Sequence, residues 1–159
     1  MSKLEVFEVS KQADQRQKAF AARIRAIFIL VFLVGIMSIS ASYLSLQNHL
    51  EALVQSLCEG VVDKNVGTKL LNFWLDELAP IEGDVLSPKA YNQWRSLHTE
   101  LHRELRLLNM DLMFLGNSRS APTQAMKKQA TRDRLEKLVR YCQQIREIIA
   151  SDDQHKPEV

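Results

Sequence analysis

Apolar residues in this chain follow two different patterns. Between Ala26 and Leu46 they form a run of 21 residues without a single charge, and beyond that run they recur every three or four residues. A bilayer core about 30 Å thick needs roughly 20 apolar residues in a helix. The run therefore predicts one transmembrane helix, and the later spacing predicts amphipathic helices, each with one apolar face.

The spaced apolar residues form four stripes, and the first of them continues the membrane run without a break. Each isolated helix would leave such a stripe exposed to water, so we expect the helices to bury their stripes against one another. This predicts an all-α protein, an antiparallel bundle of about four helices; coiled-coil pairing between chains is the alternative use of the same spacing. The stripes are Tyr43, Leu46, Leu50, Leu53 and Leu57; Leu70, Phe73, Trp74 and Leu78; Tyr91, Trp94, His98, Leu101, Leu105, Leu108, Leu112 and Leu115; and Leu135, Leu138, Cys142, Ile145 and Ile149.

Breaks between the stripes separate the predicted helices. Glycines and prolines cluster in loops, and Ser87 followed by Pro88 is typical of a helix start, with serine as the N-cap and proline in the first turn. The predicted organisation has four parts: a basic segment (1–25), a transmembrane helix (26–46), a helical bundle (47–150) and a flexible polar tail (151–159).

The charges on the two sides of the apolar run predict its orientation. Residues 1–25 carry six basic and three acidic groups, whereas residues 47–159 carry 15 basic and 16 acidic groups. Basic residues close to one end of a span tend to stay in the cytoplasm. We therefore expect a single-pass protein of the cell inner membrane, with a cytoplasmic N-terminus and a periplasmic, extracytoplasmic bundle.

A cleaved signal peptide is the alternative interpretation of the apolar run. Its apolar core would be 26–37, and Ser40, Ala41 and Ser42 resemble the small residues of a cleavage site. Against it, the leader would be about 42 residues long and apolar character resumes directly afterwards.

Two cysteines allow a disulfide if the bundle lies outside the cytoplasm. At 1.5 Å per helical residue, Cys58 and Cys142 would both lie roughly 12–18 Å above the lipid. A Cys58–Cys142 bridge is one prediction, and two free thiols packed between helices are the other.

His98 and His102 are four residues apart, so they share one face of a helix and are a weak candidate for metal binding. Glu100, between them, would point to another side of the helix, and no third ligand is evident. His98 lies on an apolar stripe, where a hydrogen-bonded core histidine is the commoner role. We therefore expect no metal site, and a structural or pH-responsive histidine pair instead.

Small residues form a stripe of their own in the apolar run: Gly35, Ser38, Ser42 and Ser45. Small side chains let helices approach closely in lipid, so the stripe predicts a packing face for a partner helix. The alternative is that these serines merely bond back to their own helix. A second surface feature is the basic side of the last helix, which we expect to be solvated: Lys127, Lys128, Arg132, Arg134, Lys137 and Arg140.

The sequence contains no nucleophile–base set, no glycine-rich phosphate loop and no cysteine-pair metal motif. It therefore predicts a protein that is not an enzyme and needs no cofactor. We expect an interaction or assembly subunit of a membrane complex, whose partners are membrane lipid and another membrane protein or a second copy of itself. No aromatic residues interleave the basic ones, so nucleic acid is not expected as a partner.

Two other functions remain open from the sequence. The first is a ligand-sensing module that signals through a partner, because the arrangement resembles that of chemoreceptor-type sensors, which place an antiparallel bundle after an N-terminal membrane helix. The second is a phage-type lysis or envelope-spanning protein.

Overall fold

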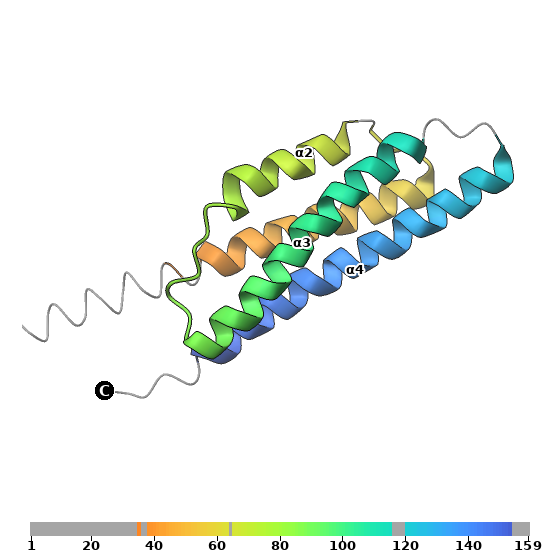
Figure 1. Cartoon of the computed structure of the whole chain (residues 1–159). Coiled ribbons are helices and arrows are strands. Elements are labelled where there is room, and N and C mark those ends of the chain that lie inside the picture. Colours follow the sequence, from red (N-terminus) through yellow and green to blue (C-terminus); the bar gives the residue numbers. More distant parts are fainter. Residues whose placement is uncertain (1–34, 36–37, 64, 116–119, 154–159) are drawn as a thin grey trace, which may run out of the picture. The chain divides into compact units, whose positions relative to one another are not determined.

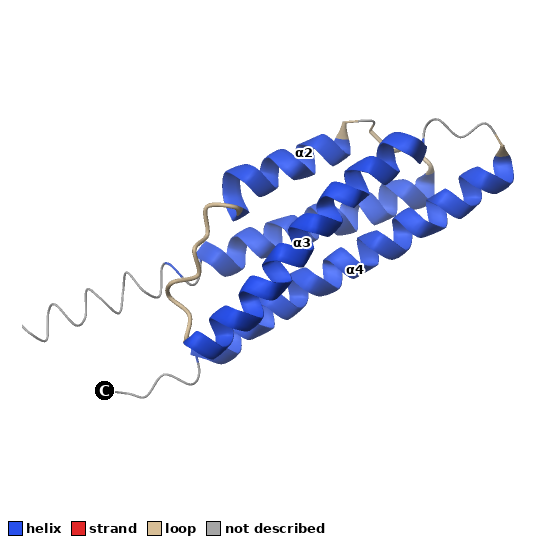
Figure 2. Cartoon of the chain, in the orientation of Figure 1, coloured by secondary structure: helices blue, strands red, loops and turns tan. Residues whose placement is uncertain are grey.

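The computed structural model describes residues 35, 38–63, 65–115 and 120–153. These residues form helices joined by loops, with no strand among them (Figures 1 and 2). The N-terminal helix is described at residues 38–59 and is followed by α2 (Val66–Phe73), which passes directly into a π-helical turn, η1 (Trp74–Leu78). Two long helices, α3 (Pro88–Leu115) and α4 (Ala121–Asp153), complete the bundle. The prediction of an all-α helical bundle is confirmed.

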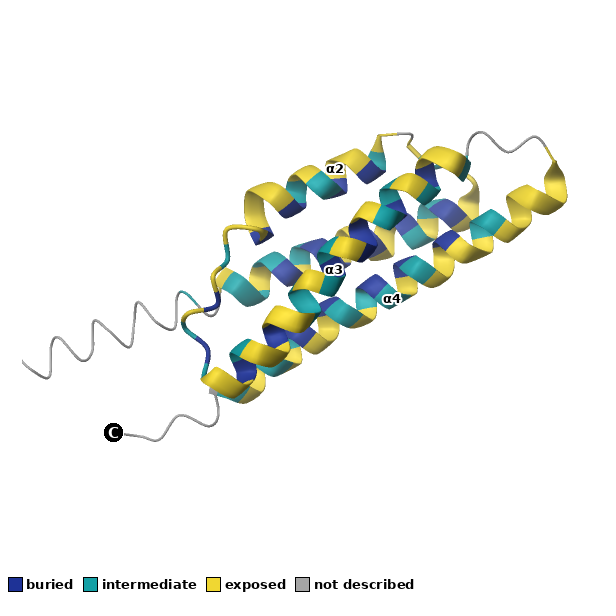
Figure 3. Ribbon diagram, in the orientation of Figure 1, coloured by how far each residue is buried: buried dark blue, intermediate teal, exposed yellow. Residues whose placement is uncertain are grey.

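The core of the bundle takes one apolar stripe from each helix (Figure 3). Most residues of the four predicted stripes are buried, and the N-terminal helix contributes all five of its stripe residues. Burying a leucine or isoleucine side chain stabilises the fold by about 1.5–3 kcal/mol, so these stripes supply the main driving force for packing. The stripe residues that remain partly accessible are Phe73, Tyr91, His98 and Leu115.

Side-chain hydrogen bonds join the start of α3 to the end of α4. The Ser87 hydroxyl accepts a bond from the backbone N–H of Ala90 at 3.4 Å, as expected of an N-cap. The backbone N–H of Ser87 donates to Asp152 Oδ2 at 2.9 Å, and its hydroxyl donates to the other carboxylate oxygen. The helix start predicted at Ser87 and Pro88 is confirmed, and Asp152 holds it against the last turn of α4.

The predicted membrane span lies mostly outside the described residues. Its last part, 38–46, belongs to the N-terminal helix, and both Tyr43 and Leu46 are fully buried in the bundle. Within the described ranges, no helix combines the length and the apolar character that a bilayer crossing requires.

Candidate functional site

Three aromatic side chains from two helices form a buried hydrogen-bonded chain. The indole N–H of Trp94 donates to the Tyr43 hydroxyl oxygen at 2.9 Å, and that hydroxyl lies 2.6 Å from His98 Nδ1. Because the Tyr43 oxygen already accepts a bond from the indole, its proton is best used toward Nδ1, and His98 then carries its own proton on Nε2. The chain satisfies the indole N–H of Trp94, the Tyr43 hydroxyl and Nδ1 of His98 inside an apolar core.

His98 and His102 both stack against an aromatic side chain and not against each other. The Trp74 ring lies 4.4 Å from the His98 ring and 5.1 Å from the His102 ring, measured between centroids. Burial lowers the pKa of His98 from 6.5 to about 4, with a smaller contribution from the charge of His102. Burial also lowers the pKa of His102. Both rings are therefore neutral at neutral pH.

The surroundings of the histidine pair are mainly aromatic. Among the described residues, no three His, Cys, Asp or Glu side chains lie close enough together to hold an ion. Trp74 lies against both histidine rings, and the charge of Arg106 acts on His102. The geometry suits a packed structural pair.

A buried carboxylate links α3 to the basic side of α4. The side chain of Glu104 is only 4% exposed; it binds Arg134 and accepts a hydrogen bond from Lys137 Nζ at 2.8 Å. Arg134 Nε also donates to Asp111 Oδ2 at 2.7 Å. Burial alone would raise the pKa of Glu104, but the hydrogen bonds and charges of Lys137 and Arg134 outweigh it and hold the pKa below its ordinary value.

Glu104→Gln should therefore destabilise the bundle by about 1 kcal/mol. The cost is modest because Arg134 remains paired with Asp111, and because water can hydrate both Arg134 and Lys137 once the carboxylate charge is removed. Glu100→Gln is the matched control on the same helix, since its carboxylate is 39% exposed and pairs with Arg103 at the surface. Urea unfolding of the two variants should separate them; equal losses would mean that burial of Glu104 adds nothing.

The predicted Cys58–Cys142 bridge is not formed, and both thiols are free. Cys58 is exposed, whereas Cys142 is buried, and burial raises the pKa of its thiol to about 12. Leu57, which is next to Cys58, lines the same cavity as Lys128, so these residues lie at one level of the bundle. Cys142 follows Lys128 by fourteen helical residues, which correspond to about 21 Å along α4. The two cysteines therefore lie at different levels of the bundle.

The three serines of the small-residue stripe lie on the accessible side of the N-terminal helix. Ser38 is exposed, Ser42 and Ser45 are half-buried, and the Ser42 hydroxyl bonds back to the Ser38 carbonyl at 3.3 Å. A Cβ added at Gly35 would meet no atom within 4 Å. The structure thus shows a serine bonded to its own helix and leaves Ser38, Ser42 and Ser45 outside the bundle core.

A second accessible stripe, apolar in character, lies at the C-terminal end of α3. Met110, Met113 and Phe114 are 51%, 62% and 54% exposed and occupy positions i, i+3 and i+4 of one helix face. Near the start of α4, Met126 is 75% exposed. Lys127 Nζ lies 5.9 Å from the centre of the Phe114 ring, so the two helices contact each other here. We call Met110, Met113 and Phe114 the methionine stripe.

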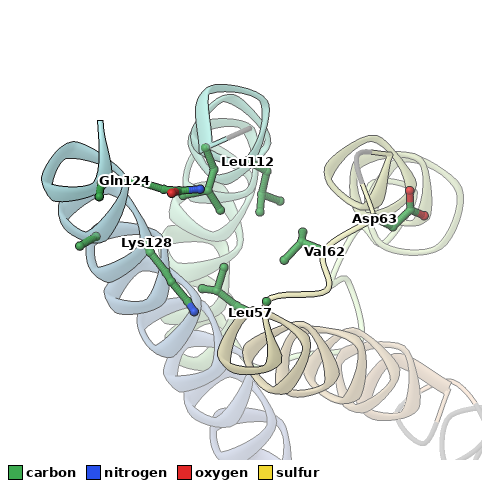
Figure 4. A pocket seen from close by; sticks show the side chains of 10 residues that line it. Leu57, Val62, Asp63, Leu112, Gln124 and Lys128 are labelled. Carbon is green, nitrogen blue, oxygen red and sulfur yellow. The ribbon is translucent and has the colours of Figure 1, made fainter. Parts of the chain in front are cut away.

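A cavity of about 460 Å³ opens at the same end of the bundle, where the N-terminal helix ends and α4 begins (Figure 4). Apolar side chains of the N-terminal helix, the following loop and α3 form its walls: Leu57, Val62, Leu112 and Leu115. Gln124 and Lys128 extend from α4 toward these walls. Asp63, at the edge, pairs with Lys69 Nζ at 2.7 Å.

The sequence matches no protein-family model, and neither curated proteins nor solved structures show significant similarity to it. The functional argument therefore depends on the geometry of this chain alone. The sequence pattern had indicated the histidine pair and the small-residue stripe. It had not indicated the cavity, the methionine stripe or the burial of Glu104.

Proposed function

We propose that this protein is a non-enzymatic interaction subunit of a membrane complex, and that the methionine stripe is its main contact with a partner protein. The carrying observation is that three large apolar side chains of one helix face are more than half exposed. Contiguous exposed apolar surface on a folded domain is typical of a site that binds another protein.

The methionine stripe is not needed for the bundle itself. The core face of the same stretch of α3 is already provided by Leu105, Leu108 and Leu112, all of which are buried. Methionine is flexible and polarisable, so it adapts to the surface of a partner at low cost. The exposed parts of these side chains can therefore contact a second surface.

The position of the methionine stripe also suits a subunit held in a membrane at its other end. The C-terminal end of α3 lies at the end of the bundle opposite the first described turns of the N-terminal helix, which are orange in Figure 1. The apolar run before residue 38 supplies the anchor in this proposal, and the small-residue stripe supplies a face for a partner membrane helix. The partner is another membrane protein or a second copy of this chain.

Replacing both methionines by lysine, in the Met110→Lys/Met113→Lys variant, should lower recovery of the partner about tenfold. The reason is that two charges would have to be buried at the centre of the contact. The full chain is purified from membranes in mild detergent, and its stoichiometric partner or second copy is quantified by mass spectrometry and light scattering.

Leu75→Lys is the matched control, because Leu75 is 58% exposed but lies on η1, away from the methionine stripe. This variant should recover the partner as the unmodified chain does. A chain that is purified alone as a monomer would contradict the proposal, and so would an equal loss in the control and the double variant.

A further inference from the structure

The core stripe of α4 changes character along the helix. In the C-terminal two thirds it consists of large apolar residues, from Leu135 to Ile149, and all of them are buried. Toward the N-terminus, polar or small residues occupy the same face at helical spacing. In order along the helix from Leu135, they are Thr131, Lys128, Ala125, Gln124 and Ala121. The opposite walls remain apolar through Leu57, Leu112 and Leu115. At this level α4 therefore contributes no large apolar side chain to the core, and a cavity of about 460 Å³ lies there instead.

The first turns of α4 consequently have few packing contacts with the rest of the bundle. None of residues 121–130 is buried, and the first buried residue of the helix is Thr131, whose hydroxyl bonds back to the Lys127 carbonyl at 2.9 Å. A helix segment without buried apolar contacts opens at a low free-energy cost. Anything that filled the cavity would give these turns a packing partner.

The charges at the cavity are uneven. Asp63 is neutralised by Lys69, and that hydrogen bond, with a further one from the Asn65 backbone, holds the pKa of the Asp63 carboxyl below its ordinary value. Lys128 forms no ion pair with any other described residue. Its side chain extends from α4 toward Leu57, whereas the Gln124 amide extends toward Leu112 (Figure 4). The site thus offers one unpaired cation and one amide against an apolar wall.

From this arrangement we propose that the cavity is a binding site for a small amphipathic carboxylate. Its apolar chain packs on Leu57, Val62 and Leu112, and its carboxylate pairs with Lys128 Nζ. The volume falls in the range of roughly 300–1,000 Å³ that small-molecule sites occupy. Such binding goes beyond an assembly role, because it would make the order of the first turns of α4 depend on a ligand.

The test uses the full chain in lipid nanodiscs with hexanoate as the probe. Hexylamine has the same chain with the opposite charge, and acetate has the charge without the chain. We expect saturable binding of hexanoate and at least tenfold weaker binding of the other two. Hydrogen exchange of amides 121–130 should slow on binding, and the amides of the C-terminal half of α4 should not change.

Lys128→Gln should weaken hexanoate binding about tenfold, because the charge-assisted contact is lost. The matched control is Lys127→Gln, since Lys127 is the neighbouring lysine but lies over the Phe114 ring; it should leave binding unchanged. Ala125→Leu should fill the cavity and abolish binding while the chain still folds. Absence of saturable binding, equal binding of hexylamine, or equal affinity of the two lysine variants would each overturn the proposal. Partner recovery through the methionine stripe is measured separately, so either proposal can fail alone.

Discussion

Gly83→Ala should destabilise the bundle by about 3 kcal/mol. Gly83 lies in the connection between η1 and α3 and has a φ of +70°. A Cβ there would lie 2.6 Å from Cζ3 and 2.7 Å from Cε3 of Trp94. The indole cannot move aside easily, because it is only 2% exposed and its N–H is bonded to Tyr43. Strain and steric overlap therefore add.

Gly60→Ala is the matched control for this prediction. Gly60 has a similar φ of +78°, but a Cβ added there would meet no atom within 4 Å. Only the backbone strain remains, and we expect a loss of about 1 kcal/mol. Urea unfolding of the full chain in mild detergent would compare the two. Equal losses would show that the Trp94 contact is unimportant, whereas partial rescue of Gly83→Ala by Trp94→Phe would locate the overlap in the indole ring.

Acid should cost the bundle about 2 kcal/mol through His98 alone. The pKa of this side chain is lowered from 6.5 to about 4 in the folded chain, so below pH 6.5 the unfolded state binds a proton that the folded state does not. Stability therefore falls as the pH falls from about 6.5 to about 4 and then levels off. At 1.36 kcal/mol per pKa unit the upper limit is about 3 kcal/mol, and partial access of solvent to the ring reduces it.

The main cause of this loss is the burial of the His98 ring, and the charge of His102 contributes less. The groups that face His98 are Tyr43, Trp74, Trp94 and His102, and none of them is an anion at neutral pH. A proton on Nδ1 would displace the one that Tyr43 donates and would place a charge among these rings.

His98→Asn keeps an acceptor near the position of Nδ1 and cannot take up a proton. Free energies of unfolding, measured from pH 7 to pH 4 for both chains, should therefore differ in slope. Contributions of the carboxylates are common to both chains and cancel in the difference. Identical slopes would mean that His98 titrates normally in the bundle.

The amphipathic spacing predicted the helices well because it is a local property. Leu46, Leu50 and Leu53 are three or four residues apart, which puts them on one helix face whatever that face packs against. The start of α3 was predictable for the same reason, since Ser87 caps and Pro88 begins the helix within a few residues of chain.

The histidine pair was predictable only in part. Spacing placed His98 and His102 on one face. It could not show that Trp74, from another helix, stacks on His102 and lies tilted against His98. Glu104 was missed because it stands next to the stripe residue Leu105 and looks like an ordinary surface glutamate. Its burial depends on Arg134 and Lys137, which arrive from α4.

The cavity left one readable trace in the sequence. Before Leu135 the core positions of α4 are occupied by Thr131, Lys128 and Ala125, where large apolar residues would be expected. That change shows that α4 has no large apolar side chains on its core face before Leu135. It does not show that the facing helices keep theirs at the same level, and this second condition is what makes a cavity.

The chain's local chemistry thus determined that it forms helices, which side of each helix is buried and where α3 begins, since each depends on residues within a few positions of one another. The tertiary structure alone decided how far each helix is shifted along its neighbours. That axial register separates Cys58 from Cys142, brings Tyr43 to Trp94 and His98, and leaves Lys128 opposite Leu57. Periodicity specifies the direction of a side chain around a helix axis, and it carries no information on the height of one helix relative to the next.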